Sequence, residues 1–462
     1  MGEHAHRWAG RPVLVAGAAV AGSAAAAALL RRGAVVTVLD RAGSAATARL
    51  AAAGARVVIT DGAPPPELLA GVSELVVSPG FPPHHRLVSA ARAAGLEVYS
   101  EPELAWRLRG DHDPVWLAVT GTNGKTTTVT MLAAMLRAAG LRAAAAGNVG
   151  EPLVDRTGYQ VLAVELSSQQ LHWSATLAPP VGALLNLAPD HLEWHGGFEA
   201  YVTAKTAIWR GAGVAVGNLD DPRVAALLAA APGRAVGFTL AEPRPGQLGC
   251  SGGVLLDRAF GTAGGEPVPL AELAVVRPPG EHHLANALAA AAVARAYGVP
   301  AEAVRAGLAG YQPLPHRNAP VAEVAGVTYV DDSKATNPHA ALASLSAYPR
   351  VVWVAGGQLK GVAVDELVRA VAGRLAGAVL LGQDRAELAR ALARHAPQVP
   401  VVEVASTDDG AMGEVVRAAT ALAAPGDTVL LAPAAASRDM FTDYAQRGDA
   451  FAAAVRALGG GH

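Results

Sequence analysis

Short apolar runs alternate with alanine-rich segments along most of this chain. In the first 110 residues the apolar runs lie at Val13–Ala16, Val35–Leu39, Arg56–Ile59, Glu74–Val77 and Leu96–Tyr99. Short strands that alternate with helices are typical of a parallel sheet covered by helices. The pattern therefore predicts a small, doubly wound, Rossmann-like α/β domain over residues 1–110.

Residues 13–30 carry no charge, so they could be misread as a signal peptide or a membrane span. Alanine and glycine make up most of this stretch, and both are only weakly apolar. The stretch also has internal order, with a strand, a loop from Gly17 to Gly22, and a helix. We therefore expect a soluble βαβ unit here.

Two short breaks divide the remaining chain. Asp111–Pro114 and Pro313–Pro315 have the composition of linkers, which places a second domain at residues 111–314 and a third at 315–462. In the second domain we expect strands at Val115–Val119, Val161–Glu165 and Val181–Asn186, helices at Lys125–Ala139, Phe198–Arg210 and Gly280–Gly298, and loops with short antiparallel strands over Val236–Pro279. In the third, Rossmann-like domain we expect strands at Val327–Val330, Val351–Ala355, Ala378–Leu381, Val401–Val404 and Thr428–Leu431.

The length of the chain agrees with three domains, and its composition bears on the kinds of partner that it binds. The chain has 462 residues, of which 52% are hydrophobic and 16% charged, and its formal net charge is −2. At roughly 150 residues per domain this length suits three domains, and the balanced charge gives no indication of a nucleic-acid partner. Cys250 is the single cysteine, so no intrachain disulfide can form. A reducing compartment fits this composition, and we expect a cytoplasmic monomer that acts on small molecules without a membrane.

A phosphate-binding loop is the strongest signal in the sequence. The strand Val115–Val119 is followed by Thr120-Gly121-Thr122-Asn123-Gly124, and a helix then begins at Lys125. Glycines at such a junction let backbone N–H groups surround phosphate oxygens, and the helix N-terminus adds partial positive charge. Lys125 would meet the outer phosphates, and Thr126 would offer a hydroxyl to Mg²⁺. The loop departs from the general pattern because Val119 stands where a glycine is usual.

The first turn of the chain is weaker evidence. Gly17 and Gly22 frame it, but the middle glycine of the dinucleotide fingerprint is missing, which argues against NAD. The helix start could still receive a phosphate group, and Ser78, Pro79 and Gly80 could line the same crevice. Simple turn chemistry explains these residues equally well.

Further polar residues follow the loop in a fixed order, most of them at the ends of expected elements. Glu165 ends a strand, where an acid beside a phosphate loop is the usual Mg²⁺ partner. Taken singly the others are weak, because a lone histidine or helix lysine is more often structural or solvated. The series is Asn148, Glu165, Ser167, Asp190, His191, Lys205, Asn286, His316, Arg317, Asp331-Asp332-Ser333-Lys334-Ala335-Thr336-Asn337-Pro338 and Ser437.

This order, together with TGTNGKTT, resembles the Mur ligase family, the amide-forming enzymes of peptidoglycan precursor synthesis. DDSKATNPHA and the closing APAAASRDMFTDYAQRGDAF look like the branch that adds D-glutamate. The resemblance covers nearly the whole chain. It implies an ATP-dependent ligase that joins D-glutamate to UDP-N-acetylmuramoyl-L-alanine through an acyl phosphate.

The resemblance also implies roles for individual residues. Lys125 and Thr126 would hold ATP and Mg²⁺ with Glu165, and His191 would serve a second Mg²⁺ with Lys205, which is carbamylated in the family. Lys334 would lie near the γ-phosphate. The residues expected to bind ATP are Gly121, Thr122, Asn123, Gly124, Lys125, Thr126, Thr127, Asn286, Arg317 and Asp332. Those expected to be catalytic are Lys125, His191, Lys205 and Lys334.

Substrate contacts are expected in two domains besides the central one. Asp40 ends the second strand, where it could accept a hydrogen bond from uracil or ribose. The uridine-diphosphate end is expected at Gly17, Gly22, Asp40, Ser78, Pro79 and Gly80, further substrate contacts at Asn148, Ser167 and His191, and D-glutamate at Thr336, Lys360, Ser437 and Tyr444. The two carboxylates of D-glutamate need positive charge and hydroxyl donors. The family position of Tyr444 carries Phe.

One departure and two alternatives remain open. His283 stands where the family has an asparagine that contacts adenine, so we expect altered nucleotide contacts rather than lost activity. A folylpolyglutamate synthase shares the fold and the loop and also adds glutamate. A P-loop binding protein without ligase activity is the second alternative.

Overall fold

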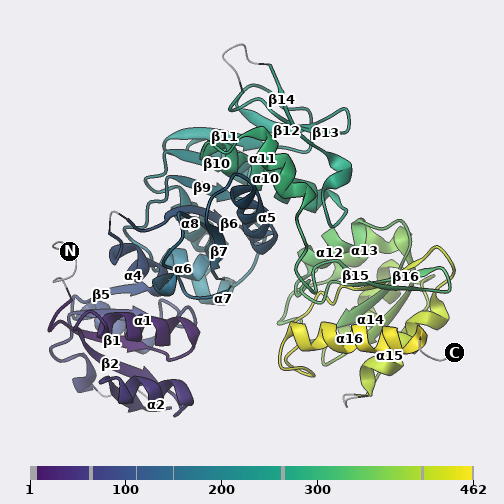
Figure 1. Cartoon of the computed structure of the whole chain (residues 1–462). Helices are drawn as coiled ribbons and strands as arrows, with labels where there is room; N and C mark the ends of the chain where they lie inside the picture. Colours follow the sequence, from purple (N-terminus) through teal and green to yellow (C-terminus); the bar gives the residue numbers. More distant parts are fainter. Residues whose placement is uncertain are drawn as a thin grey trace. The chain divides into compact units, whose positions relative to one another are not determined.

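The structure is a computed structural model that describes residues 8–61, 66–110, 112–148, 150–261, 266–406 and 410–459. Asp111 of the expected first linker and Val149 lie outside these residues. The chain forms two compact units, Met1–Val275 with Ala285–Tyr311, and Val276–Leu284 with Gln312–His462. Three separate sheets are present, two in the first unit and one in the second (Figure 1).

The first sheet is wholly parallel, in the order β3-β2-β1-β4-β5. The uncharged stretch 13–30 divides into β1 and α1, as expected, and no helix among the described residues is long and apolar enough to cross a membrane. The elements are β1 (Pro12–Ala16), α1 (Val20–Leu30), β2 (Val35–Asp40), α2 (Ala45–Ala52), β3 (Arg56–Ile59), the 3₁₀ helix η1 (Pro66–Leu69), β4 (Glu74–Val77), α3 (Arg86–Ala93), β5 (Glu97–Ser100) and α4 (Glu101–Arg107).

The second sheet has nine strands in the order β14-β13-β12-β11-β10-β9-β6-β8-β7. Its strands are parallel from β7 to β12, and β12 to β14 pair antiparallel. The strands are β6 (Val115–Thr120), β7 (Ala143–Gly147), β8 (Val161–Glu165), β9 (Val181–Leu184), β10 (Val214–Asn218), β11 (Arg234–Phe238), β12 (Gln247–Ser251), β13 (Val254–Asp257) and β14 (Val268–Glu272). The helices are α5 (Lys125–Ala138), η2 (Leu153–Asp155), α6 (Ser168–His172), α7 (Leu192–His195), α8 (Phe198–Thr206), η3 (Ala207–Trp209), α9 (Pro222–Ala229), η4 (Leu273–Val275), α10 (Glu281–Ala296) and α11 (Ala301–Ala309).

The third sheet runs β15-β16-β20-β17-β18-β19, and only β15 is antiparallel to its neighbour. Alternate residues of β17 face opposite sides: Trp353 packs in a core with α12 to α14, and Val354 packs in another with α15 and α16. The elements are β15 (Ala319–Val324), β16 (Val327–Asp331), α12 (Pro338–Ser346), β17 (Val351–Gly356), α13 (Asp365–Val371), η5 (Ala372–Arg374), β18 (Leu375–Leu381), α14 (Arg385–His395), β19 (Val401–Glu403), α15 (Ala411–Leu422), β20 (Thr428–Leu431) and α16 (Tyr444–Gly459). Because β20 lies between β16 and β17, three carboxyl ends meet side by side.

Three strands were missing from the sequence-based expectation, namely β7, β10 and β15. β7 reads Ala-Ala-Ala-Ala-Gly, and alanine has low strand propensity, so its place beside β8 decides its conformation. β15, an edge strand, carries a proline, Pro320, and a charged residue, Glu323, which interrupt its apolar pattern. β11 begins earlier than expected and pairs in parallel with β10, so the antiparallel part of the expected stretch is confined to β12–β14.

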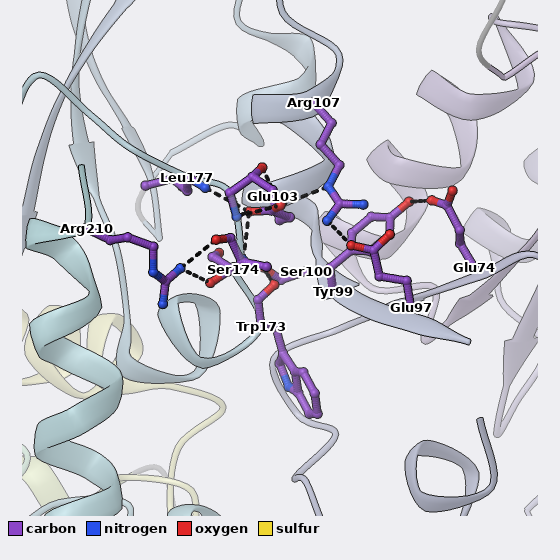
Figure 2. Close-up of polar contacts among 12 residues, drawn as sticks. Glu74, Glu97, Tyr99, Ser100, Glu103, Arg107, Trp173, Ser174, Leu177 and Arg210 are labelled. Atoms are coloured by element: carbon purple, nitrogen blue, oxygen red, sulfur yellow. Dashed lines mark hydrogen bonds and ion pairs between the residues drawn. The ribbon is translucent and has the colours of Figure 1, made fainter. Parts of the chain in front are cut away.

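Within the first unit, helix α4 joins the first sheet's domain to the second (Figure 2). The fully buried Glu103 carboxylate accepts hydrogen bonds from the backbone N–H groups of Ala175, Thr176 and Leu177 at 3.0–3.2 Å. Arg107 offsets its charge by donating from Nε at 2.8 Å. Glu101, on the same helix, accepts from the Val154 amide at 2.8 Å. Two buried carboxylates of one helix therefore hold backbone segments of the neighbouring domain.

Candidate active site

The predicted phosphate loop has the expected strand–loop–helix geometry. It connects β6 to α5, and Gly124 caps the helix in a left-handed conformation with φ of 85°. A Cβ atom on Gly124 would lie 2.2 Å from Oδ1 of Asn286, so only glycine fits there. Asn286 also accepts from the Thr128 hydroxyl at 3.3 Å, which places this predicted ATP residue directly against the loop.

Lys125 folds back onto its own loop. Its ammonium donates to the carbonyl oxygens of Gly121 and Thr122, each at 2.9 Å. A lysine held at the helix N-terminus by two neutral carbonyls can exchange them for phosphate oxygens, which are stronger acceptors.

The expected Thr126–Glu165 pair is present. The Thr126 hydroxyl donates to Oε2 of Glu165 at 2.8 Å, and the Asn148 amide donates to Oε1 at 3.0 Å. Glu165 ends β8 and is only 2% exposed. A hydroxyl and a carboxylate are hard oxygen donors of the kind Mg²⁺ prefers, so this pair fits the ion.

Lys205 lies deep beside the same loop. Its Nζ donates to the Gly121 carbonyl at 2.7 Å and lies 3.4 Å from the Thr120 hydroxyl. Burial, and secondly the charge of Lys125, hold the pKa of this amine well below its ordinary value. Burial therefore favours the neutral form of the amine, which is the nucleophilic form.

Lys125, Asn148 and Lys205 line a cavity of about 340 Å³. Both the first and second sheets' domains contribute to it, since Pro79 and Gly80 follow β4. Its lining comprises Pro79, Gly80, Thr122, Lys125, Asn148, Ser167, Ser168, Gln169, Asp190, His191, Tyr201 and Lys205. Sequence reasoning did not select Gln169 or Tyr201. Tyr201 reads in the sequence as an apolar residue of a helix, yet its hydroxyl forms a hydrogen bond with Thr122 Oγ1 at 2.8 Å.

His191 stands at the edge of this cavity. Its backbone is left-handed, with φ of 51°, and its side chain is 52% exposed. Nε2 lies 3.7 Å from Oδ2 of Asp190. In the described parts of the chain no three His, Cys, Asp or Glu side chains gather as a metal site.

The predicted residues of the first turn gather around one another. The Ala18 amide donates to Oδ2 of Asp40 at 2.5 Å, and the Ser78 hydroxyl donates to the Gly17 carbonyl at 3.3 Å. Gly22 packs so tightly on the turn that a Cβ would lie 1.8 Å from the Gly17 oxygen. One carboxylate oxygen of Asp40 is thus already occupied by a hydrogen bond from the turn.

The remaining predicted residues belong to the second compact unit. Lys334 Nζ lies 4.0 Å from the centre of the Tyr444 ring, a cation–π contact. Gln358, two residues before Lys360, pairs with Ala436, next to Ser437, through two backbone hydrogen bonds of 2.8 and 3.0 Å. The loops that carry Lys334, Thr336, Lys360, Ser437 and Tyr444 therefore lie at one edge of the third sheet.

Asp332 and His283, expected near the nucleotide base, also lie in this unit. Burial raises the pKa of Asp332 to about 6, and the nearby Arg317 charge partly offsets this rise. The ring of His283 packs against that of His282, with ring centres 3.9 Å apart and planes tilted by 44°. Its buried ring nitrogens have no hydrogen-bond partner among the described residues, and burial holds its pKa well below the ordinary value.

Three family models match successive parts of the chain. Residues 11–100 match the MurD-like N-terminal domain of Mur ligases, residues 119–294 the Mur ligase middle domain, and residues 316–435 the Mur ligase glutamate ligase domain. The chain belongs to the Mur ligase family.

Relatives agree along their whole length. This Mur ligase is 55% identical over 464 residues to the UDP-N-acetylmuramoylalanine--D-glutamate ligase of Thermobifida fusca, covering 98% of this chain and 99% of the relative. It is 54% identical to the enzyme of the same name from Streptomyces coelicolor, with 98% and 99% covered. These matches do not favour a folylpolyglutamate synthase or a P-loop protein without ligase activity.

Solved structures share the fold of this Mur ligase at low identity. UDP-N-acetylmuramate-alanine ligase MurC from Thermotoga maritima superposes with a TM-score of 0.59 at 16% identity, covering 97% of this chain and 99% of that one. MurF from Acinetobacter baumannii gives 0.58 at 21% identity, with 91% and 90% covered. These likenesses confirm the three-domain α/β fold.

Proposed function

We propose that this Mur ligase joins D-glutamate to UDP-N-acetylmuramoyl-L-alanine, converting ATP to ADP and phosphate, as a step of peptidoglycan precursor synthesis. Relatives that carry the name of this reaction are 55% identical over nearly the full chain. The observation that supports the chemistry most directly is the convergence of Lys125, Glu165 and Lys205 on one loop beside the cavity.

The reaction needs activation because a carboxylate does not react with an amine at neutral pH. An oxygen of the alanyl carboxylate attacks the γ-phosphorus, and ADP leaves. The amine of D-glutamate then attacks the acyl carbon and loses a proton, and the C–O bond to phosphate breaks. Enclosing the acyl phosphate protects it from water.

Lys125 and the helix start would receive the phosphates of ATP. The lysine would leave the Gly121 and Thr122 carbonyls and bind the outer phosphates, where its charge stabilises the transition state. Thr126 and Glu165 would hold one Mg²⁺. The ion supplies positive charge to the crowded phosphate oxygens.

Lys205 is proposed to carry a carbamate, formed when its neutral amine attacks CO₂ and loses a proton. Burial of the amine supports this, because a protonated lysine is unreactive toward CO₂. A carbamate would place anionic oxygens next to Gly121 and could hold a second Mg²⁺ with His191. It would add an anionic donor to Asp190, which lies beside His191 in the same cavity.

The other assignments extend the same proposal. The first-domain turn, with Pro79 and Gly80 in the cavity wall, would bind the uridine-diphosphate end, and Asn148 and Ser167 would meet the rest of that substrate. The loops of Lys334, Thr336, Lys360, Ser437 and Tyr444 would bind D-glutamate and the γ-phosphate. Asn286, Arg317 and Asp332 would meet adenosine. ATP and UDP-sugars are cytoplasmic compounds, so we propose that the enzyme acts in the cytoplasm. We also propose that it acts as a monomer.

A phosphate-release assay tests the proposal. The enzyme receives ATP, Mg²⁺ and UDP-N-acetylmuramoyl-L-alanine with D-glutamate, L-glutamate, D-aspartate, L-lysine, meso-diaminopimelate or L-alanine. We expect rapid phosphate release and a new amide with D-glutamate alone. Equal or faster turnover with another amino acid would reject the assignment while leaving the acyl-phosphate chemistry possible. Nucleotide binding without phosphate release would reject a ligase.

A further inference from the structure

Arg447, on α16, is a charged side chain buried inside the third domain. It is 1% exposed, and five hydrogen bonds use the donors of its guanidinium group. Nε donates to the Ser333 hydroxyl at 2.9 Å, and Nη2 donates to the Ser333 carbonyl at 2.9 Å. The other bonds reach the carbonyls of Gly356 at 3.3 Å and of Ala435, twice, at 3.1 Å.

These acceptors are unusual for a buried arginine, because none of the four acceptor atoms belongs to a carboxylate. Burial lowers the pKa of Arg447 to about 10, with Asp439 and Asp331 nearby to offset part of the shift. The group is therefore still charged at neutral pH. Burying a guanidinium without a carboxylate partner costs free energy, which its hydrogen bonds offset only in part. We therefore look for a role that requires the planar fork of donors.

The three bonded residues mark three adjacent strand ends. Ser333 follows β16, Gly356 ends β17, and Ala435 follows β20. Because β20 lies between β16 and β17, one guanidinium can reach all three ends. Packing is tight: a Cβ on Gly357 would lie 2.1 Å from the Ala436 carbonyl and 3.3 Å from Nη1 of Arg447.

Each strand end leads directly into a loop proposed for the amino-acid substrate. Ser333 precedes Lys334 and Thr336, Gly356 precedes Lys360, and Ala435 precedes Ser437. The Ser333 hydroxyl also donates to the Tyr444 carbonyl at 2.7 Å, which links α16 to the first loop.

We propose that Arg447 is a positioning residue that holds these three loops in register for the amino-acid substrate. It acts through the loop backbones rather than on the substrate. The inference rests on the proposed function for the location of the amino-acid site. Its specific consequence is that a loss of the guanidinium fork impairs amino-acid binding most, with a smaller effect on ATP, because all three loops are proposed to meet the amino acid and only the Ser333 loop carries Lys334 and Asp332.

The test compares Arg447→Lys with a matched control, Arg295→Lys. Arg295 is also largely buried and donates to backbone carbonyls, Val299 at 2.8 Å and Phe260 at 3.1 Å, but it lies in the middle domain and pairs with Asp257. Lysine keeps the charge and loses the fork. KM is measured separately for D-glutamate, ATP and the UDP-substrate, together with the melting temperature.

We expect Arg447→Lys to raise KM for D-glutamate about tenfold or more, with the other two KM values within about twofold. Arg295→Lys should lower the melting temperature without this selective change. Equal changes in all three KM values of Arg447→Lys, or no change, would overturn the proposal.

Ser333→Ala provides a milder variant if Arg447→Lys does not fold. It removes one acceptor of the guanidinium and the link to Tyr444, and we expect a severalfold, selective rise in KM for D-glutamate. An unchanged KM in this variant would also overturn the proposal. If the wild-type enzyme prefers another amino acid, the proposed function fails, and Arg447 is tested with the preferred one.

Discussion

Two strand–turn–helix units of this Mur ligase look alike in topology and differ in charge. In the first, between β1 and α1, the Ala18 amide already donates to the Asp40 carboxylate. In the second, between β6 and α5, Lys125 lies on loop carbonyls and the nearest strand-end acid, Glu165, bonds to the Thr126 hydroxyl. A helix N-terminus by itself therefore does not define a phosphate site. The nearby side chains decide whether the helix N-terminus is occupied by a carboxylate of the protein, as by Asp40, or is available for a phosphate group.

Removing the cation of the second turn should have the largest effect on this contrast. Lys125→Ala takes away a charge placed for the transition state, so we expect phosphate release to fall about a hundredfold to a thousandfold. Thermal stability should change little, because Nζ donates to two carbonyls of its own loop, Gly121 and Thr122. Activity within about threefold of wild type would show that the lysine is dispensable.

Lys205 tests whether the second turn acquires an anion by modification. Lys205→Ala should be nearly inactive, and acetate should partly restore activity by replacing the carbamate. Lys125→Ala is the matched control, since acetate cannot replace a cation. The readout is phosphate release with and without acetate, beside Mg²⁺ binding. Intact metal binding with no response to acetate would reject the modification.

Glu101 tests the contact between helix α4 and the second sheet's domain, which holds together the two domains that carry these turns. Burial raises the pKa of this carboxyl from 4.5 to about 7, with a further contribution from Asp155, against the hydrogen bonds from Val154 and Leu153. Between these values the folded protein holds a proton that the unfolded chain has lost. Stability should therefore fall as pH rises from about 4.5 to about 7, by at most about 3 kcal/mol, and level off above.

Melting temperatures of wild type and Glu101→Gln across this pH range provide the measurement. The variant cannot ionise, so its melting temperature should fall less than that of wild type. Parallel curves for the two proteins would show that Glu101 does not titrate in this window.

Asp40 should give the smallest effect. Asp40→Asn keeps an acceptor for the Ala18 amide and removes the charge, so we expect a loss of about 1 kcal/mol in unfolding free energy. KM for the UDP-substrate should rise severalfold, whereas KM for ATP should not change. A normal KM for the UDP-substrate would show that this turn serves folding only.

The sequence predicted elements and local motifs better than long-range polar contacts. α5 begins at Lys125 as expected, and Glu165 meets Thr126, because strand periodicity and loop chemistry are local signals. β7 escaped prediction because its alanines favour no strand, and its pairing with β8 comes from the sheet. Glu103 and Arg447 could not be found from sequence alone. Each resembles a solvated helix charge. The backbone amides that bond to Glu103 lie 72 to 74 positions away, and the acceptors of Arg447 lie 12 to 114 positions away.

The Glu103 joint has a consequence for building hybrid enzymes. Exchanging residues 1–110 between two ligases would transplant the carboxylate and leave behind the amides of Ala175, Thr176 and Leu177 that it serves. A foreign segment without an acid at this position would bury those donors unpaired, an unfavourable state for the recipient. The helix α4 and the turn at residues 175–177 therefore depend on each other, although they are far apart in the sequence. A hybrid enzyme should take both segments from the same parent.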